Sequence, residues 1–321
     1  MINSDSNIDR SPRFVIEFDT KTGKIKVDKN QYIYPKPLEI VSGELTLFVL
    51  GSPIIDYRVN KTHIANDILN KSFIDEGYIK CLDGEFLLIL INRKSKKIEV
   101  ANDRFSSFTL YYYVNNGKVV LSHAYIDILE RISIFESLRI KEDVIFEYLW
   151  FRRVFDNRTY DNYSKFLKPA SLISIGYDGI SRTNYWRPTY VKNNNSLESN
   201  SQILKDLLVS ALEKKTSDIK DEKIGLFLSG GMDTRTILSL FDNIDHLKPP
   251  HCFTIGYSES GEYRVAKKLT EALNSPHEFI KLKENFYDIS WNEKLNMTGG
   301  MHNQYTILFS GTPVCSHNSC I

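Results

Sequence analysis

An apolar run, two glycines with an acidic residue, and a helical pattern follow one another without interruption in KIGLFLSGGMDTRTILSLF, residues 223–241. Helical and strand-like segments alternate around it from about residue 203, with helical patterns at 203–215, 234–241 and 262–274 and strand-like runs at 224–229, 251–257 and 277–282. Such alternation predicts a parallel sheet with helices on its faces. The turn SGGMDT is therefore expected at the carboxyl end of a parallel strand, where open α/β sheets bind ligands.

The turn SGGMDT has the composition of a phosphate-binding loop. Gly230 and Gly231 let a ligand approach the main chain. Their N–H groups and those of the next helical turn can point at an anion, which the helix dipole also favours. The hydroxyls of Ser229 and Thr234 add hydrogen-bond donors. The turn is not a GxxxxGK[ST] motif, and the alternative is a plain glycine turn in which Asp233 caps the helix.

The first half of the chain has a different pattern. Residues 13 to about 187 consist mainly of short β-rich runs separated by turn signals, which predicts strands, with a helical interval near 124–155. The continuous apolar run FLLILI at 86–91 is expected to be buried on both faces. The polar stretch 191–202 has the composition of a linker. We therefore expect one domain at 1–190 and a second at 203–321.

Composition narrows the class of partner. The 321 residues carry 41 basic and 40 acidic side chains, so we expect neither nucleic acid nor an acidic membrane surface as the main partner. The apolar runs at 45–50 and 86–91 are too short to span a bilayer. The first residues lack the basic start and apolar core of a signal peptide. A cytoplasmic protein without a membrane segment is the expectation.

The four cysteines form neither a disulfide framework nor a metal-ligand pattern. Free thiols in a reducing compartment are expected. Cys81, which precedes the strand-like run GEFLLILI, is expected in the core rather than as a nucleophile.

Three segments carry a resemblance to a known family. SGGxD followed by a hydroxyl residue matches the PP-loop of ATP pyrophosphatases, which cleave ATP between the α- and β-phosphates. Residues 253–282, FTIGYSESGEYRVAKKLTEALNSPHEFIKL, look like the second strand and helix of the synthetase domain of asparagine synthetases. Residues 82–129 are similar to the amidotransferase-like domain of that family, with its DGEF strand, DR turn and LYYY strand. Together the resemblance covers roughly residues 80–315.

The resemblance implies an α/β fold. An antiparallel, amidotransferase-like β-sandwich would precede a parallel sheet with flanking helices, like that of adenine nucleotide α-hydrolases. It also implies ATP and Mg²⁺ as cofactors, with a small-molecule or peptide carboxylate and an amine donor as substrates. The products would be an amide, AMP and pyrophosphate.

The resemblance also assigns residue roles. Asp233 would help to hold magnesium and, with Ser229 and Thr234, would act at the reacting phosphates. Arg235 is either a further phosphate contact or an exposed helix residue, and Glu262 is expected to be an early-helix charge. The implied nucleotide-binding residues are Leu228 and Ile255 through their main chains to the adenine, Ser229, Gly230, Gly231, Asp233 and Thr234 to the triphosphate, and Gly256, which otherwise forms a plain strand-end turn.

Two parts of the family pattern are not found. Ile2 stands where glutamine-dependent members have a cysteine nucleophile, so we expect no glutaminase activity and an amine supplied as ammonia or within the substrate. The second acidic motif of the synthetase domain is not found before TPVCSHNSCI, so that domain is expected to be truncated.

Two functions stay open at this point. The chain either forms amides with ATP, alone or with a second chain that completes the domain or as a homodimer, or it is a non-catalytic paralogue. In the second case it would bind only nucleotide or a partner.

Overall fold

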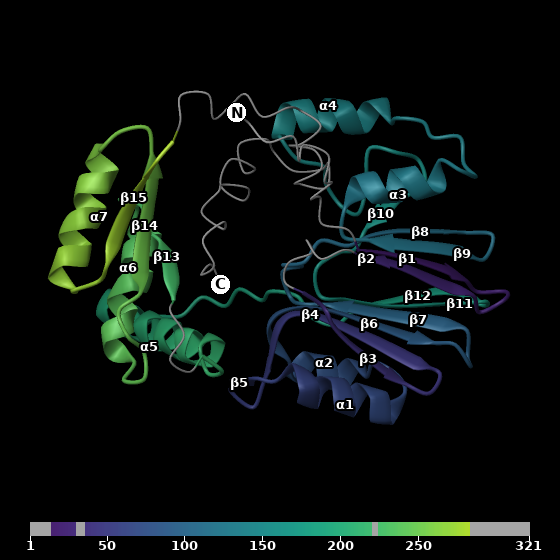
Figure 1. Cartoon of the computed structure of the whole chain (residues 1–321), viewed down its shortest axis with the longest axis horizontal. Coiled ribbons are helices and arrows are strands. Elements are labelled where there is room, and N and C mark those ends of the chain that lie inside the picture. The colour runs from purple at the N-terminus through teal and green to yellow at the C-terminus, as the bar shows by residue number, and fades with distance from the viewer. Residues whose placement is uncertain (1–13, 30–35, 220–223, 283–321) are drawn as a thin grey trace, which may run out of the picture. The chain divides into compact units, whose positions relative to one another are not determined.

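The computed structural model describes residues 14–29, 36–219 and 224–282 (Figure 1). The chain is a mixed α/β protein that divides between Tyr190 and Val191 into two compact units. Unit 1 comprises the described residues up to 190, and unit 2 those from 191 to 282. Ile2 and the stretch TPVCSHNSCI lie outside the described residues.

Unit 1 contains two antiparallel sheets. The first has five strands in the order β10 (Lys165–Phe166), β8 (Tyr111–Asn115), β9 (Lys118–Ser122), β1 (Phe14–Asp19) and β2 (Ile25–Lys29). The second has seven, in the order β12 (Gly179–Asn184), β11 (Ser171–Gly176), β7 (Lys97–Asn102), β6 (Asp83–Asn92), β4 (Leu45–Ile55) and β3 (Leu38–Ser42), with β5 (Arg58–Val59) paired to β4. The helices of unit 1 are α1 (Lys61–Lys71), α2 (Glu76–Cys81), α3 (Tyr125–Ile132) and α4 (Glu142–Phe151).

The two sheets share one apolar core. Its buried members include Ile16 of β1, Phe48 of β4, Ile89 of β6 and Leu121 of β9. Helices α1 and α2 pack on the other face of the seven-stranded sheet, and α3 packs on the other face of the five-stranded sheet (Figure 1). Strand β6 therefore has apolar neighbours on both faces, and residues 86–91 are all buried, as the run FLLILI predicts.

Helices α1 and α2 are a difference from the sequence prediction, which assigned this region mainly to strands. Each is preceded by an N-cap residue whose side chain accepts a main-chain N–H, Asn60 from His63 and Asp75 from Tyr78. Such caps satisfy N–H groups that the first helical turn leaves open. Cys81, at the end of α2, is exposed, so the expectation of a core position for it is wrong.

Unit 2 contains a parallel sheet of three strands in the order β13 (Gly225–Phe227), β14 (His251–Gly256) and β15 (His277–Lys281). Helix α5 (Leu197–Lys215) precedes the sheet, α6 (Met232–Leu240) follows β13 and continues into the short η1 (Phe241–Asn243), and α7 (Gly261–Ala272) follows β14. The structure thus contains the parallel sheet that the helix–strand alternation predicts. Among the helices of the described residues, none is long and apolar enough to cross a bilayer.

The predicted linker is shorter than expected. Helix α5 begins at Leu197, because the side chain of Ser196 accepts the N–H of Ser199 and caps the first turn. The polar composition of residues 191–202 therefore reflects in part an exposed helix start. Leu228, Leu238, Cys252 and Ala266 form the buried cluster of unit 2.

Asp161 carries a buried hydrogen-bond network in unit 1. Its Oδ1 accepts the N–H groups of Tyr163 at 2.6 Å and Ser164 at 2.7 Å. Its Oδ2 accepts the hydroxyls of Tyr125 at 2.9 Å and Thr159 at 3.0 Å, and that of Ser164. Burial by itself raises the pKa of Asp161, but these donors outweigh it, so the net pKa lies below the usual 3.8.

We expect Asp161→Asn to lower the free energy of unfolding by about 2 kcal/mol at neutral pH. The NH₂ group of the asparagine amide would face N–H and O–H groups that now donate to the Asp161 carboxylate. The pKa of Asp161 is lower in the folded chain than in the unfolded chain. The extra stability of the native chain over the Asp161→Asn variant is therefore fully present above pH 3.8 and is lost as the pH falls through the folded-state pKa. Urea unfolding at neutral and acidic pH measures both effects. The control is Asp156→Asn, which removes an exposed carboxylate paired with Lys168 and should cost at most about 1 kcal/mol. Equal losses in the two variants would contradict the assignment.

Candidate functional site

Leu228 joins strand β13 to the predicted loop. It is buried, its N–H donates to the carbonyl oxygen of Phe253 at 2.8 Å, and its own carbonyl accepts the hydroxyl of Thr254 at 2.7 Å. Both main-chain groups therefore hold the start of the loop against β14. Of the main-chain groups of Leu228, only the second lone pair of the carbonyl oxygen stays open for the adenine contact that the sequence predicts.

Ser229 and Thr234 close the loop across its base. The Thr234 Oγ1 accepts the N–H of Ser229 at 3.2 Å and lies 3.2 Å from the Ser229 Oγ. The Ser229 Oγ also accepts the N–H of Gly231 at 3.1 Å. The two hydroxyls that the sequence assigned to phosphate thus lie side by side, at the level where helix α6 begins.

Gly230 lies against the start of helix α7. A Cβ added at Gly230 would be 2.8 Å from the Cα of Glu262 and 3.1 Å from its Cβ. Non-bonded carbons prefer separations of about 3.5–4.0 Å, so a side chain here would push the loop and the helix apart. Glu262 is an exposed residue of the first turn of α7, as predicted, and it is also the residue on which the loop packs.

Helix α6 begins without a side-chain cap. Its N-cap residue is Gly231, whereas the N-cap residues of α5 and α7 are Ser196 and Ser260, whose side chains accept main-chain N–H groups. The first N–H groups of α6 are therefore not occupied by a cap, and the helix dipole favours an anion beside them. Asp233 lies exposed in the first turn, so the alternative in which it caps the helix is wrong.

Arg235 bends back toward the loop. Its Nε donates to the carbonyl oxygen of Gly231 at 3.1 Å, and the residue is half-buried. The guanidinium group therefore lies beside the start of α6 instead of extending into solvent. This position keeps a permanent positive charge next to the loop.

Ile255 lies two residues beyond Phe253, the last residue of β14 that pairs with β13. Strand β13 pairs with His251–Phe253 only, while β14 continues to Gly256. The main-chain groups of alternate strand residues face the same neighbour. Ile255 therefore presents its main chain on the same side as Phe253, past the end of β13 and next to the loop.

Gly256 has a less specific position. A Cβ added there would lie 3.5 Å from the ring of Phe279, an ordinary contact, and its carbonyl oxygen accepts the N–H of Leu282 at 2.9 Å. The strand-end alternative is sufficient to explain this glycine.

Asp233 is the acidic residue assigned to magnesium. Within the described residues, no group of three or more His, Cys, Asp or Glu side chains comes together. Mg²⁺ commonly keeps several waters and binds one or two carboxylates together with substrate phosphates. A single exposed carboxylate beside an uncapped helix start fits a metal held mainly through phosphate oxygens.

Thr254 and His277 support the loop and were not singled out from the sequence. The Thr254 Oγ1 lies 2.8 Å from His277 Nε2 while it donates to the carbonyl of Leu228. Because the Thr254 hydroxyl donates its proton to Leu228, the Nε2–H of His277 is the donor in this contact. Burial, with the charges of Lys267 and His251, lowers the pKa of His277. The contact joins Thr254 and His277, which are far apart along the chain, so no local sequence pattern predicts it.

The same part of the chain matches a known family. Residues 204–292 match the family model described as asparagine synthase. Through this segment, the chain is similar to asparagine synthetases. The matched residues include β13, the loop, α6, β14, α7 and β15.

Two curated relatives are similar to the chain over a longer stretch. A probable glutamine-hydrolyzing asparagine synthetase of Acanthamoeba polyphaga mimivirus is 23% identical over 219 residues, covering 64% of this chain and 36% of that protein. Asparagine synthetase (glutamine-hydrolyzing) 1 of Bacillus subtilis is 25% identical over 214 residues, covering 62% of this chain and 32% of that protein. The chain therefore spans about a third of the length of these relatives.

Among solved structures, glutamine phosphoribosylpyrophosphate amidotransferase from B. subtilis, complexed with ADP and GMP, is similar at 10% identity. The match covers 87% of this chain and 65% of that chain, and its TM-score of 0.32 defines no shared fold.

Proposed function

We propose that unit 2 uses ATP to activate a carboxylate for amide formation, in the manner of an asparagine synthetase. The observation that carries this proposal is the loop Ser229–Thr234, which joins a parallel strand to an uncapped helix inside the segment that matches asparagine synthase. The substrates would be a small-molecule or peptide carboxylate and an amine.

The loop supplies the phosphate-binding groups in this proposal. Main-chain N–H groups of Gly230 and of the start of α6 would bind the phosphates. The Gly231 N–H and the hydroxyls of Ser229 and Thr234 bond to one another and to the Ser229 carbonyl within the loop, and they would exchange these bonds for phosphate oxygens on binding. Asp233 would hold Mg²⁺, which when bound neutralises charge on the phosphate oxygens. These residues act by position and electrostatics, since no covalent enzyme intermediate is required.

The end of strand β14 would receive the nucleoside. Ile255 offers its main chain beyond the end of β13, Leu228 retains one carbonyl lone pair, and Gly256 lies at the same strand end. Arg235, whose guanidinium lies beside the loop, would stabilise the charge that develops on the departing pyrophosphate.

The proposed reaction has two steps. A carboxylate oxygen of the substrate forms a bond to the α-phosphorus of ATP, and the bond from that phosphorus to the α,β-bridging oxygen breaks, which releases pyrophosphate. The amine nitrogen then bonds to the acyl carbon, AMP leaves with the oxygen that linked the two, and the nitrogen loses a proton.

The finer fold assignment is part of the same proposal. Two antiparallel sheets with one shared core support an amidotransferase-like β-sandwich for residues 1–190. The parallel sheet with α6 and α7 supports a PP-loop synthetase domain from residue 203 onward.

We further propose that the amine is ammonia or a substrate amine rather than glutamine nitrogen. Cys81 is the cysteine of unit 1 that the structure describes, and its Sγ lies 3.5 Å from the carbonyl oxygen of Gly77 on an exposed helix end. We expect no release of glutamate from glutamine and an unchanged result for Cys81→Ser. Glutamate release that Cys81→Ser abolishes would overturn this part of the proposal.

Pyrophosphate exchange tests the proposed chemistry. The purified chain, with ATP, magnesium and radiolabelled pyrophosphate, is expected to transfer label into ATP only when a suitable carboxylate is present. A panel of amino-acid and peptide carboxylates identifies the substrate. No exchange with any member, together with no thermal shift on addition of ATP, would refute an enzymatic role for this chain.

Nucleotide binding without chemistry is the second candidate function. It is favoured because Asp233 is not joined by two further acidic, His or Cys ligands within the described part of the chain. A thermal shift with ATP but no exchange with any carboxylate would select it.

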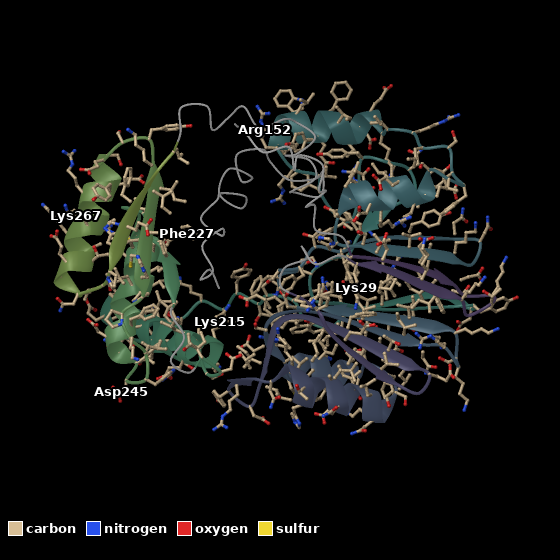
Figure 2. All side chains as sticks on the ribbon, viewed as in Figure 1. Lys29, Arg152, Lys215, Phe227, Asp245 and Lys267 are labelled. Carbon is tan, nitrogen blue, oxygen red and sulfur yellow. The ribbon has the colours of Figure 1, made fainter. Side chains whose placement is uncertain are left out.

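A partner chain or a homodimer would extend either function. Strand β13 is at an edge of its sheet in the described residues, and its last residue, Phe227, is 51% exposed (Figure 2). An open strand edge with an exposed aromatic side chain suits pairing with a further strand.

A further inference from the structure

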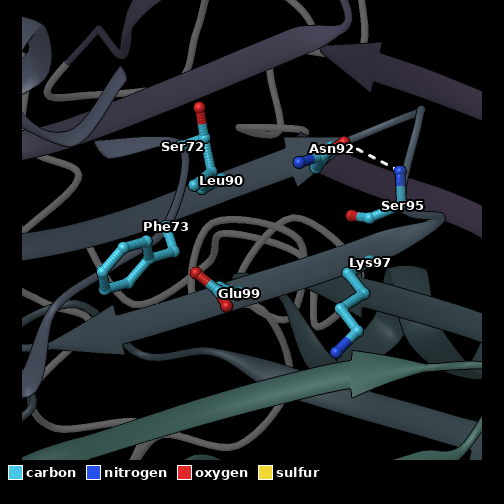
Figure 3. Close-up of a pocket in the computed structure, with 7 residues that line it drawn as sticks. All are labelled: Ser72, Phe73, Leu90, Asn92, Ser95, Lys97 and Glu99. Atoms are coloured by element: carbon cyan, nitrogen blue, oxygen red, sulfur yellow. Dashed lines mark hydrogen bonds between the residues drawn. The ribbon is translucent and has the colours of Figure 1, made fainter. Parts of the chain in front are cut away.

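A polar hollow lies in unit 1 where the end of α1 meets the β6–β7 hairpin (Figure 3). Leu90 pairs with Glu99 and Asn92 pairs with Lys97 in the antiparallel ladder, so these four side chains project from one face of the sheet. The volume is about 210 Å³, and the lining residues are Ser72, Phe73, Leu90, Asn92, Ser95, Lys97 and Glu99. The hollow has room for a small organic molecule, since one water occupies about 30 Å³ of liquid.

Glu99 offers one unused carboxylate oxygen to this hollow. The N–H of Ile74 donates to its Oε2 at 2.7 Å and fixes the side chain, while no hydrogen bond to Oε1 is found among the described residues. Burial raises the pKa of Glu99, and the Ile74 N–H and the charge of Lys97 act in the opposite direction. A positive group beside Oε1 would offset the cost of burying the negative charge.

Lys97 and Asn92 supply donors from neighbouring strands; the Lys97 stem lies over Gly176, 3.2 Å from a Cβ added there, and its ammonium is directed away from Asn92 (Figure 3). Lys97 forms no ion pair with Glu99 or with another carboxylate in the described part of the chain, although the two lie on the same face of β7. The Asn92 Oδ1 accepts the N–H of Ser95 at 2.9 Å, which leaves the amide nitrogen as a donor on the side away from Ser95 (Figure 3). An ammonium and an amide N–H together suit a carboxylate.

We propose that this hollow binds a small α-amino acid in its zwitterionic form, with the ammonium on Glu99 and the carboxylate on the Asn92 amide, toward which the flexible Lys97 side chain would turn. Alternate residues on one strand are about 6.7 Å apart. An ammonium and a carboxylate joined through one carbon, with a hydrogen bond of about 2.8 Å at each end, span about 8–9 Å, so the flexible Lys97 and Glu99 side chains would cover the difference. Phe73, which is 47% exposed, and buried Leu90 form the apolar wall for a short side chain.

Singly charged ligands fit this hollow less well. A cation on Glu99 would be repelled by Lys97 and would leave the Asn92 amide without a partner, and an anion on Lys97 would be repelled by Glu99. Only a ligand with both charges satisfies both ends. The site is independent of the ATP chemistry proposed for unit 2, because every residue named for it belongs to unit 1.

Titration calorimetry of the full chain tests the site. The probes are glycine, L-alanine, L-aspartate and L-asparagine, with alaninamide and N-acetylalanine as analogues that lack one charge each. At least one amino acid is expected to bind saturably. Each alanine analogue is expected to bind at least about tenfold more weakly than alanine, because each analogue loses one charge-assisted hydrogen bond. An absence of saturable binding in the whole panel, or equal binding of an analogue, would overturn the proposal.

Matched variants locate the binding. Glu99→Gln keeps an acceptor for the Ile74 N–H and removes the charge, and Lys97→Met keeps the aliphatic stem. Each is expected to weaken binding about tenfold. The controls are Glu44→Gln and Lys94→Met, which make the same charge changes at exposed positions outside the hollow. Binding that both pocket variants leave unchanged, with native thermal unfolding, would place the ligand elsewhere and refute the site.

Discussion

Asp233→Asn is expected to lower carboxylate-dependent pyrophosphate exchange by about a hundredfold, the usual scale for removing one group that stabilises developing charge. Asp233 is exposed in the first turn of α6 and makes no capping hydrogen bond. Asparagine has the same size, so the fold should be kept. The loss would come from magnesium that is no longer held beside the phosphates.

Asp245→Asn is the matched control for this variant. Asp245 is an exposed acidic residue of unit 2 that follows η1, away from the loop in sequence and in the unit (Figure 2). Its replacement should leave exchange and the magnesium dependence of ATP binding unchanged. If both variants exchange pyrophosphate at the native rate, Asp233 is not the metal-holding residue.

Gly230→Ala is expected to remove ATP binding and to lower the free energy of unfolding by about 1–3 kcal/mol, as overpacking does. The new Cβ would lie 2.8 Å from the Cα of Glu262, a main-chain atom that cannot rotate away. The loop would have to move off α7, which would displace the N–H groups at the start of α6. Thermal unfolding and titration with ATP and magnesium measure the two effects.

Gly261→Ala tests whether the effect is specific to this contact. A Cβ added at Gly261 meets no atom within 4 Å, although this residue lies next to Glu262 at the start of α7. We expect native stability and native ATP binding in this variant. Comparable losses in the Gly261 and Gly230 variants would show that the close approach does not explain the requirement for glycine.

The sequence was sufficient to predict the local secondary structure around the loop. An apolar strand, SGGMDT and a helical pattern in direct succession indicated a loop at the end of a parallel strand, and the structure has β13, the loop and α6 there. These features depend on residues within one short segment. There the spacing of apolar residues and the turn-forming residues predict the local structure without knowledge of distant contacts. The burial of the run FLLILI was likewise predicted from its uninterrupted apolar residues.

Contacts between distant segments could not be predicted in this way. The approach of Gly230 to Glu262, the bond from Thr254 to Leu228, and the pairing of Ile74 with Glu99 each join residues well separated along the chain. Helices α1 and α2 were missed for another reason. Both are short and polar on much of their surface, and their capping residues Asn60 and Asp75 are the local signals that identify them.

The most direct test of the account is to observe the loop itself during nucleotide binding. In the isotopically labelled chain, amide resonances of Ser229–Thr234 are followed by NMR as ATP and magnesium are added. We predict saturable shifts at Gly230, Gly231 and the first residues of α6, and none at Gly179 in the β11–β12 hairpin of unit 1. Saturation with ATP and magnesium that leaves the loop amides unmoved would contradict the assignment of this loop as the phosphate-binding site.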